Sequence, residues 1–297
     1  MIANIVIGIR ENFKEPAYVM LYSLLDNNKN IEFNIFILSD KIDCSYFIKL
    51  KNYFNCNIEI IIIDIEDIRD LNFRHIDIST FYRLKMDKYI PNDIKRILYL
   101  DTDLIINGSI EELLSMKLEE NEYVAAIKCG VSMAHLKNIG FINEIYFNAG
   151  VILFDFQKCL EKRIFSKALE LMQNDNGKFI FMDQDVLNLV LKGNVKFVDN
   201  KWNYGTFYVK TDILNNIKKL PLPIVIHYTG RYKPWHYMDT NTYSYLYRNY
   251  YKLIYDSDII YQDRKFKKIV KKHMIKLIYR FILTRVFIKK IRECYRK

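Results

Sequence analysis

The chain has 297 residues, of which 51% are hydrophobic and 27% charged, so it can bury the core of one large domain with an appendage. This composition, with only nine Gly and five Pro, excludes a disordered or low-complexity chain, and no repeat period is visible. The net charge of +10 comes from residues 264–297, which hold 14 Lys or Arg and one acid. The remaining residues hold 31 basic and 34 acidic side chains, so body and tail are interpreted separately.

The cysteines and the N-terminus indicate the cellular compartment. The five cysteines are far apart and form no CxxC, which favours reduced thiols in a cytosolic protein over disulfides or a zinc site. Residues 1–13 lack the basic region and long apolar core of a signal peptide. We therefore expect a first strand there and no export.

Strands and helices alternate in the first half. Apolar or β-branched runs predict strands at 2–9, 31–38 and 57–64, and helical spacing predicts helices at 18–25 and 44–55. This alternation is typical of parallel βαβ units, in which ligands bind at the carboxyl ends of the strands. No GxGxxG follows the first strand, so the dinucleotide fingerprint is absent.

Residues 74–91 predict a helix that Ser79 or Thr80 caps, with Phe81 and Leu84 on its inner side. Arg83 lies one turn from its start, where a helix N-terminus and a guanidinium can form an anion site. The alternative is an ordinary amphipathic helix with a solvated arginine.

The apolar run 97–100 ends in Asp101 and Asp103, with Thr102 between them. If strand pairing persists through Asp103, the two carboxylates project to the same side of the strand. Two adjacent carboxylates repel unless a cation or donors compensate them, so this pair predicts a divalent-cation site. The alternative is a polar turn that ends a strand.

Two polar interruptions follow in the second half, after a short helix at 110–116 and a strand at 123–128. Asn148-Ala149-Gly150 interrupts an apolar strand at 146–155, as happens where a ligand or backbone approaches closely, or at a bulge. Asp183, Gln184 and Asp185 begin a predicted helix within 179–191, where acids can be functional or can cap the helix.

Residues 223–235 predict a strand that ends in His227, followed by Gly230 and Lys233. A histidine at a strand end is often structural. With a glycine and a lysine after it, His227 can instead be a metal ligand, with Gly230 allowing close backbone approach and Lys233 neutralising phosphate.

Five motifs together resemble glycosyltransferase family 8, whose retaining enzymes include glycogenin and bacterial lipopolysaccharide galactosyl- and glucosyltransferases. They are RLK (83–85), YLDTD (99–103), FNAGV (147–151), DQDVLN (183–188) and HYTGRYKPW (227–235). The resemblance is greatest to the lipooligosaccharide α-galactosyltransferase branch and covers roughly residues 2–240. It implies a GT-A catalytic domain at 1–240, with a Rossmann-like, mostly parallel sheet and a small antiparallel insert, followed by a basic helical extension at 241–297.

The resemblance also implies the site residues and the activity. The expected donor is a UDP-sugar, used with Mn²⁺, or with Mg²⁺ as the alternative, to transfer glucose or galactose to a saccharide of a cell-surface glycan. The matching positions are the metal ligands Asp101, Asp103 and His227, the diphosphate contacts Gly230 and Lys233, the sugar contacts Arg83 and Asn148, Asp183 and Gln184 beside the anomeric carbon, Asn12 at the nucleoside, and Gly8, Thr102 and Ala149 as further donor-site residues.

One departure concerns the base. This family branch commonly has an Asp after the first strand, but this chain has Arg10, which has only donors and cannot accept from the uracil N3–H. UDP is therefore expected from the resemblance alone, and Asp64 or a backbone group is a candidate acceptor.

The expected mechanism follows from the charges that develop as the sugar–phosphate bond breaks. The metal and Lys233 should stabilise the diphosphate, and nearby acids or amides the oxocarbenium-like centre. Gln184 is a poor nucleophile, so we expect same-face substitution rather than a covalent intermediate on Asp183 or Asp185. A sugar-nucleotide hydrolase, a nucleotidyltransferase, a transferase acting on glycoprotein and an inactive binding protein are the alternatives.

The tail suggests a surface for anionic lipids. Its uncharged runs are too short to span a bilayer, and its basic residues fit two amphipathic helices separated near Leu283-Thr284. We expect residues 264–297 to hold the protein on the inner face of the membrane, in the cytoplasm. Packing of the tail on the body is the alternative, and a nucleic-acid partner is not expected because no recognised module is present.

Overall fold

The computed structural model describes most of the chain, and the chain forms two compact units, 1–229 and 230–297. The domain boundary at residue 240 stays a prediction. The described residues are 1–41, 45–69, 77–175, 177–205, 222–261, 263–270 and 274.

A seven-stranded sheet forms the centre of the first unit among its described residues, with the strand order β3-β2-β1-β4-β7-β6-β8. All neighbouring pairs are parallel except those of β7, which is antiparallel to β4 and β6. A second sheet pairs β5 with β9 antiparallel. The strands are β1 Ile2–Gly8, β2 Glu32–Ser39, β3 Cys56–Ile62, β4 Arg96–Leu100, β5 Leu104–Ile106, β6 Val124–Ile127, β7 Val151–Asp155, β8 Val195–Val198 and β9 Val225–His227.

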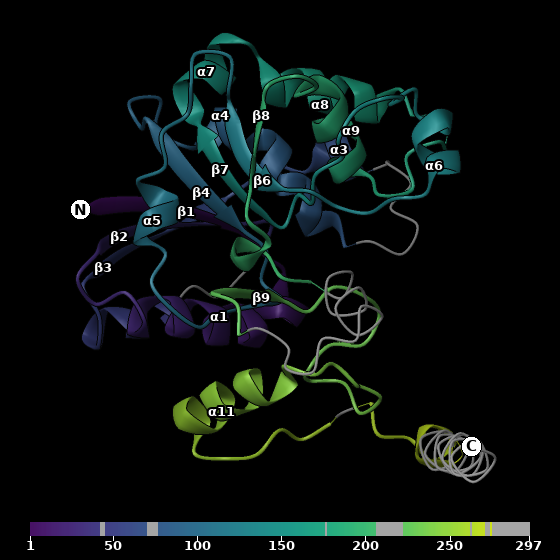
Figure 1. Ribbon diagram of the computed structural model, residues 1–297. Coiled ribbons are helices and arrows are strands. Elements are labelled where there is room, and N and C mark those ends of the chain that lie inside the picture. The colour runs from purple at the N-terminus through teal and green to yellow at the C-terminus, as the bar shows by residue number, and fades with distance from the viewer. Residues whose placement is uncertain are drawn as a thin grey trace, which may run out of the picture. The chain divides into compact units, whose positions relative to one another are not determined.

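Helices flank this sheet, with α1 on one side and α7, α8 and α9 on the other (Figure 1). The predicted mixed, mostly parallel α/β architecture with a small antiparallel sheet is confirmed. The helices of the first unit are η1 Glu11–Phe13, α1 Lys14–Asp26, α2 Ser45–Ile48, η2 Lys49–Asn52, α3 Glu66–Arg69, η3 Ile78–Lys85, α4 Met86–Tyr89, α5 Glu111–Leu114, α6 Met133–Asn138, α7 Phe156–Glu161, α8 Ile164–Gln173, α9 Asp183–Val190 and η4 Asn200–Trp202.

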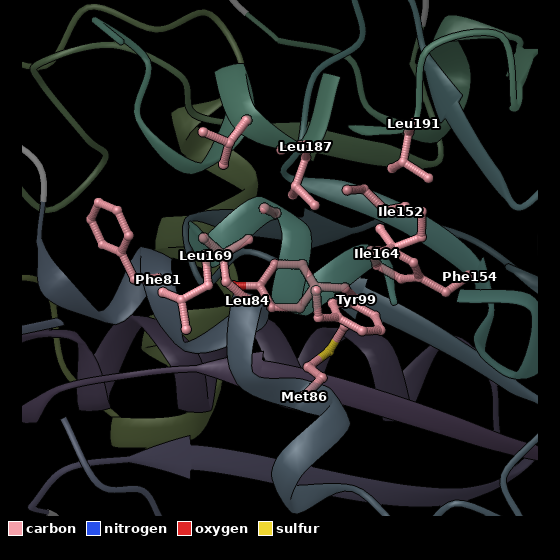
Figure 2. Close-up of a cluster of buried hydrophobic side chains, with 14 of the residues drawn as sticks. Phe81, Leu84, Met86, Tyr99, Ile152, Phe154, Ile164, Leu169, Leu187 and Leu191 are labelled. Atoms are coloured by element: carbon pink, nitrogen blue, oxygen red, sulfur yellow. The ribbon is translucent and has the colours of Figure 1, made fainter. Parts of the chain in front are cut away.

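Burial explains why the central strands read as continuous apolar runs. Parallel strands covered on both faces have no solvent side, and β4 is buried from Ile97 to Leu100. In the edge strand β3 only Cys56 is buried, and the other residues are partly buried or exposed. Figure 2 shows Tyr99 of β4 packed among Leu84 and Met86, with Phe154 of β7 close by. This core supports the strand ends that carry the candidate site.

Two helix predictions are wrong in detail. The helix predicted at 44–55 begins within residues that the structure does not describe, and its described part is the short α2 followed by the 3₁₀ turns of η2. The segment 74–91, of which the structure describes residues 77–91, forms the 3₁₀-helix η3 followed by the short α-helix α4, and the cap is Asp77 rather than Ser79 or Thr80. The Asp77 carboxylate accepts from Ser79 N at 3.0 Å and so satisfies one of the backbone N–H groups that have no partner within the first turn.

The described part of the second unit contains α11, Ser244–Tyr255, and local ion pairs. Arg248 Nη2 donates to Asp239 Oδ2 at 2.6 Å, and Asp263 accepts from Tyr237 N and Lys268 Nζ. No helix in the described part of the chain is long and apolar enough to cross a membrane. Of the two predicted tail helices, the structure describes only residues 264–270 and 274, of which 266–270 and 274 are helical; the rest lies outside the described residues.

Candidate functional site

The Asp101–Asp103 motif lies where the chain leaves one sheet and enters the other. Pairing of β4 with β7 ends at Leu100, and Asp101 N then donates to Gly150 O at 2.8 Å. The condition under which the two carboxylates would share one side of a strand, pairing through Asp103, is therefore not met. The next strand, β5, pairs with β9, which places Leu104 opposite His227. This change of sheet brings a distant histidine to the two carboxylates.

The three predicted metal ligands form a compact cluster. His227 Nε2 lies 3.2 Å from Asp103 Oδ1 and 3.8 Å from Asp101 Oδ2, and one ligand atom from each residue lies within 4.8 Å of the others. Two carboxylates and an imidazole suit Mn²⁺ or Mg²⁺ better than zinc. The cluster is a candidate cation site with both acids still partly accessible.

Gly150 makes room for this cluster. A Cβ atom at position 150 would lie 2.3 Å from His227 Cε1 and 2.8 Å from Asp101 Oδ2, distances that real Cβ atoms do not adopt. The sequence indicated a close approach at Asn148-Ala149-Gly150, and the approaching groups are these two ligands. The absence of a side chain at Gly150 is what lets a cation-sized site form.

Arg83 is the buried cation of the site. It is 2% exposed, so the alternative of a solvated arginine is wrong. Its guanidinium contacts Asp101 Oδ1 at 2.6 Å and Asp183 Oδ2 at 3.1 Å, and it stacks over the Tyr99 ring at 4.1 Å. Burial opposes its charge, but the neighbouring Asp101, Tyr99 and Asp183 raise the pKa of Arg83 above its usual range.

Asp183 and Gln184 begin α9, as predicted, beside this arginine. Burial raises the pKa of the Asp183 carboxyl to about 6, against the opposing attraction of Arg83. Met182, just before the helix, has a φ of 50°, which a bulky side chain rarely adopts. The backbone thus turns sharply to deliver the acid and the amide to one place.

The Gln184 amide is held by hydrogen bonds with residues 146–149, the segment just before β7. Its Oε1 accepts from Asn148 Nδ2 and from Ala149 N, both at 3.0 Å, and its Nε2 donates to the Tyr146 hydroxyl at 3.3 Å. Tyr146 in turn donates to the fully buried Asp185. Asp185 also accepts from Phe181 N and pairs with His135 Nε2, each at 2.8 Å. Gln184 is therefore fixed in orientation.

Gly8, predicted in the donor site, ends β1, and Asn12, predicted at the nucleoside, lies in η1 just after it. Gly8 is packed so closely that a Cβ would lie 2.7 Å from Ser79 O, and Asn12 Nδ2 donates to Asp77 Oδ2 at 3.4 Å. Arg10 Nε lies 3.5 Å from Asp40 Oδ2. The carboxyl ends of β1 and β2 meet on one edge of the sheet, where parallel α/β sheets bind ligands.

The remaining predicted residues fall in both units. Thr102 is buried between Asp101 and Asp103 in the chain, and Ala149 is buried where its backbone N–H donates to Gln184 Oε1. Gly230, with a φ of 101°, and Lys233, whose backbone N–H donates to His236 Nδ1 at 3.0 Å, belong to the second unit. Their predicted contact with diphosphate stays a prediction.

Three residues of the site escaped the sequence analysis. Asn203 contacts His227 Nδ1 at 2.8 Å and Asn148 Oδ1 at 2.7 Å, yet nothing in its local sequence marks it. Tyr146 and His135 are separated from Asp185 by about 40 to 50 residues, with no periodic signal between them.

Comparisons with known proteins agree with this geometry. The sequence model of Glycosyl transferase family 8 matches residues 4–239. A lipopolysaccharide 1,2-glucosyltransferase of Escherichia coli is 29% identical over 94% of this chain and 85% of its own length. A lipopolysaccharide 1,3-galactosyltransferase of Salmonella typhimurium is 31% identical over 78% of this chain and 73% of its own length.

A solved structure of the galactosyltransferase LgtC, in complex with donor and acceptor sugar analogues, superposes with a TM-score of 0.74. The two sequences are 25% identical, and the superposition covers 83% of this chain and 94% of the LgtC chain. A lower similarity to mouse xyloside xylosyltransferase 1, with a TM-score of 0.55 and 16% identity, concerns the fold alone. The expected GT-A-like fold is thereby confirmed, and the chain belongs to glycosyltransferase family 8.

Proposed function

We propose that this protein transfers glucose or galactose, with retention of configuration, from a UDP-sugar to a saccharide acceptor of a cell-surface glycan such as lipopolysaccharide. The observation that carries the proposal is the convergence of an Asp-Asp-His cluster with a buried arginine and a fixed Gln184 amide. The named activities of the similar bacterial enzymes support the substrate class.

The residues present fit a divalent cation. Asp101 Oδ1 accepts from Arg83, and Oδ2 faces His227. Arg83 thus holds the carboxylate in place while Oδ2 stays on the side of the candidate cation site. Gly150 leaves open the space that a cation between these ligands needs. Mn²⁺ bound there would act as a Lewis acid on the leaving diphosphate.

The protein's own residues orient the sugar. Arg83 compensates the negative charges of Asp101 and Asp183 that it contacts. Asp183 and Gln184 then face the anomeric carbon from α9 and stabilise positive charge that develops there. Because an amide is a poor nucleophile, we assign Gln184 to positioning and expect same-face substitution.

We place the base of the nucleotide at the carboxyl ends of β1 and β2. We assign Gly8 and Asn12 to the nucleoside side, and Gly230 and Lys233 to the diphosphate. Arg10 is paired with Asp40, and the Asp64 carboxylate accepts from Glu66 N at 2.9 Å. Uridine selectivity is therefore to be tested directly against the other nucleotides.

A donor screen tests the proposal. The protein is incubated with Mn²⁺ and UDP-glucose or UDP-galactose, with and without a glucose- or galactose-terminated oligosaccharide. Consumption of the donor that requires the acceptor supports transfer. Consumption without acceptor identifies the second candidate, a sugar-nucleotide hydrolase using the same metal site, and no consumption of any donor contradicts both.

The basic tail adds a second proposal about location. Residues 264–297 carry 14 Lys or Arg, and each cation near an anionic leaflet contributes roughly 1 kcal/mol. We assign them to reversible binding at the cytoplasmic face of the membrane, where lipid-linked acceptors would be presented.

A further inference from the structure

His227 can bind a cation through Nε2 only if that nitrogen keeps its lone pair, so the position of the ring proton matters. An imidazole carries the proton on one nitrogen or the other, and the partner of the second nitrogen decides which. In this structure Nε2 faces the two carboxylates and Nδ1 faces Asn203. Whether the Asn203 oxygen or its NH₂ group faces Nδ1 therefore determines which ring nitrogen of His227 carries the proton.

Two backbone N–H groups fix the polarity of the amides that surround Asn203. A backbone N–H always donates, so the Gln184 atom next to Ala149 N must be oxygen. By the same argument the Asn148 atom at 3.0 Å from Gly150 N is its Oδ1. The two results agree, because they leave Asn148 Nδ2 donating to Gln184 Oε1.

Asn203 then has only one possible orientation. It is 1% exposed, and one of its amide atoms lies 2.7 Å from Asn148 Oδ1, which can only accept. That atom is therefore Nδ2. The other atom, Oδ1, lies 2.8 Å from His227 Nδ1, so Nδ1 must carry a proton.

We propose that Asn203 is a positioning residue that holds His227 in the Nδ1–H form and turns the Nε2 lone pair toward the cation site. The inference rests on the proposed function in one respect, that His227 serves a metal. Through Asn148 the same amide is joined to Gln184, so the metal side and the sugar side of the site share one set of hydrogen bonds. Partners of this kind typically affect metal affinity about 10- to 100-fold.

Nitrogen NMR of the histidine rings tests the inference without any enzymatic reaction. Metal-free protein is recorded at alkaline pH, so that the ring is neutral, and the His227 signals are identified by their loss in His227→Gln. We expect the Nδ1–H form in the unsubstituted protein and in Asn203→Asp, which keeps an acceptor for Nδ1. We expect Asn203→Leu, of similar size but without an acceptor, to populate the Nε2–H form.

Mn²⁺ binding, followed by electron paramagnetic resonance with and without UDP, gives the second readout. Asn203→Leu should bind Mn²⁺ about 10- to 100-fold more weakly. Asn194→Ala is the matched control, because Asn194 also donates a side-chain hydrogen bond, at 2.8 Å to Asn121 O, but in an exposed place away from the site.

Either of two results overturns the inference: an Nε2–H ring in the unsubstituted protein, or Asn203→Leu with an unchanged ring and unchanged Mn²⁺ affinity. If Asn203→Leu does not fold, the ring state of the unsubstituted protein still decides. A protein that binds no Mn²⁺ with or without UDP would contradict the proposed function, whereas the NMR result judges the role of Asn203 by itself.

Discussion

At the scale of single residues, one buried guanidinium balances two acids. Arg83 contacts both Asp101 and Asp183. Its attraction does not fully offset the burial of Asp183, and burial raises the pKa of that carboxyl from 3.8 to about 6. The folded protein therefore holds this proton more tightly than the unfolded chain. Stability contributed by the carboxyl is present below pH 4 and is lost as the pH rises through 6.

Asp183→Asn should reveal this titration. The variant has no carboxyl to ionise at position 183. Its free energy of unfolding should therefore rise relative to that of the unsubstituted protein as the pH increases from 4 to 6.5. At about 1.36 kcal/mol per pH unit, the gain is on the order of 2 to 3 kcal/mol. Urea unfolding of both proteins in EDTA at pH 4, 5.5 and 7 measures it, and a difference that does not change with pH would contradict the assignment.

Gly150 makes a second test at this scale. In Gly150→Ala the new methyl group would overlap His227 Cε1 and Asp101 Oδ2, so these ligands must move apart. We expect Mn²⁺ affinity to fall at least tenfold. Gly108→Ala is the control, because a Cβ there meets Ile224 only at 3.7 Å. Calorimetric titration with Mn²⁺ measures both, and equal affinities for the two variants would disprove the role of Gly150.

At the scale of elements, the start of α9 is anchored from several directions. Asp185, in its first turn, is fully buried and accepts from Tyr146, Phe181 N and His135. Because Tyr146 donates its proton to Asp185, its oxygen must accept from Gln184. The residues that anchor the helix thus also orient the Gln184 amide.

Tyr146→Phe separates the two roles. Removing one hydroxyl should lower the free energy of unfolding by about 1 to 2 kcal/mol and leave the fold intact. The loosened Gln184 should lower kcat roughly tenfold with little change in the KM for donor. Steady-state kinetics measures this against Tyr53→Phe, whose ring is exposed. A loss of stability without a change in kcat would mean that Tyr146 contributes to the fold but does not orient Gln184.

Local patterns account for the elements that the sequence predicted well. Apolar runs gave the central strands, and the acids before an apolar periodicity gave the start of α9. The three metal-ligand candidates stood out as polar residues at the ends of apolar runs, and the family resemblance joined them into one set. The change of sheet at Asp101–Asp103 could not be predicted, because it depends on pairing with β9, far along the chain. Asn203 was missed for the same reason, since its partners are all distant in sequence.

At the scale of the whole molecule, charge separates the body from the tail. Residues 264–297 hold nearly a third of the Lys and Arg, whereas the rest of the chain is slightly acidic. This distribution is the basis of the proposal that the cationic segment binds anionic surfaces.

Truncation tests the role of the tail. A chain that ends at Asp263 should keep its activity on a soluble oligosaccharide acceptor but no longer sediment with anionic liposomes. The full chain should sediment with them at low salt and be released at high salt, because screening weakens the attraction. Neutral phosphatidylcholine liposomes are the control, and sedimentation unchanged by the truncation would refute the proposal.

The central claim is metal-dependent transfer with retention, and proton NMR of the anomeric signals tests it in one measurement. With Mn²⁺, a UDP-α-hexose and an oligosaccharide acceptor, we expect an α-linked product. No product should form in EDTA, and Asp101→Asn should lower the rate by at least two orders of magnitude. A β-linked product, transfer in EDTA, or release of free hexose without acceptor would contradict the account.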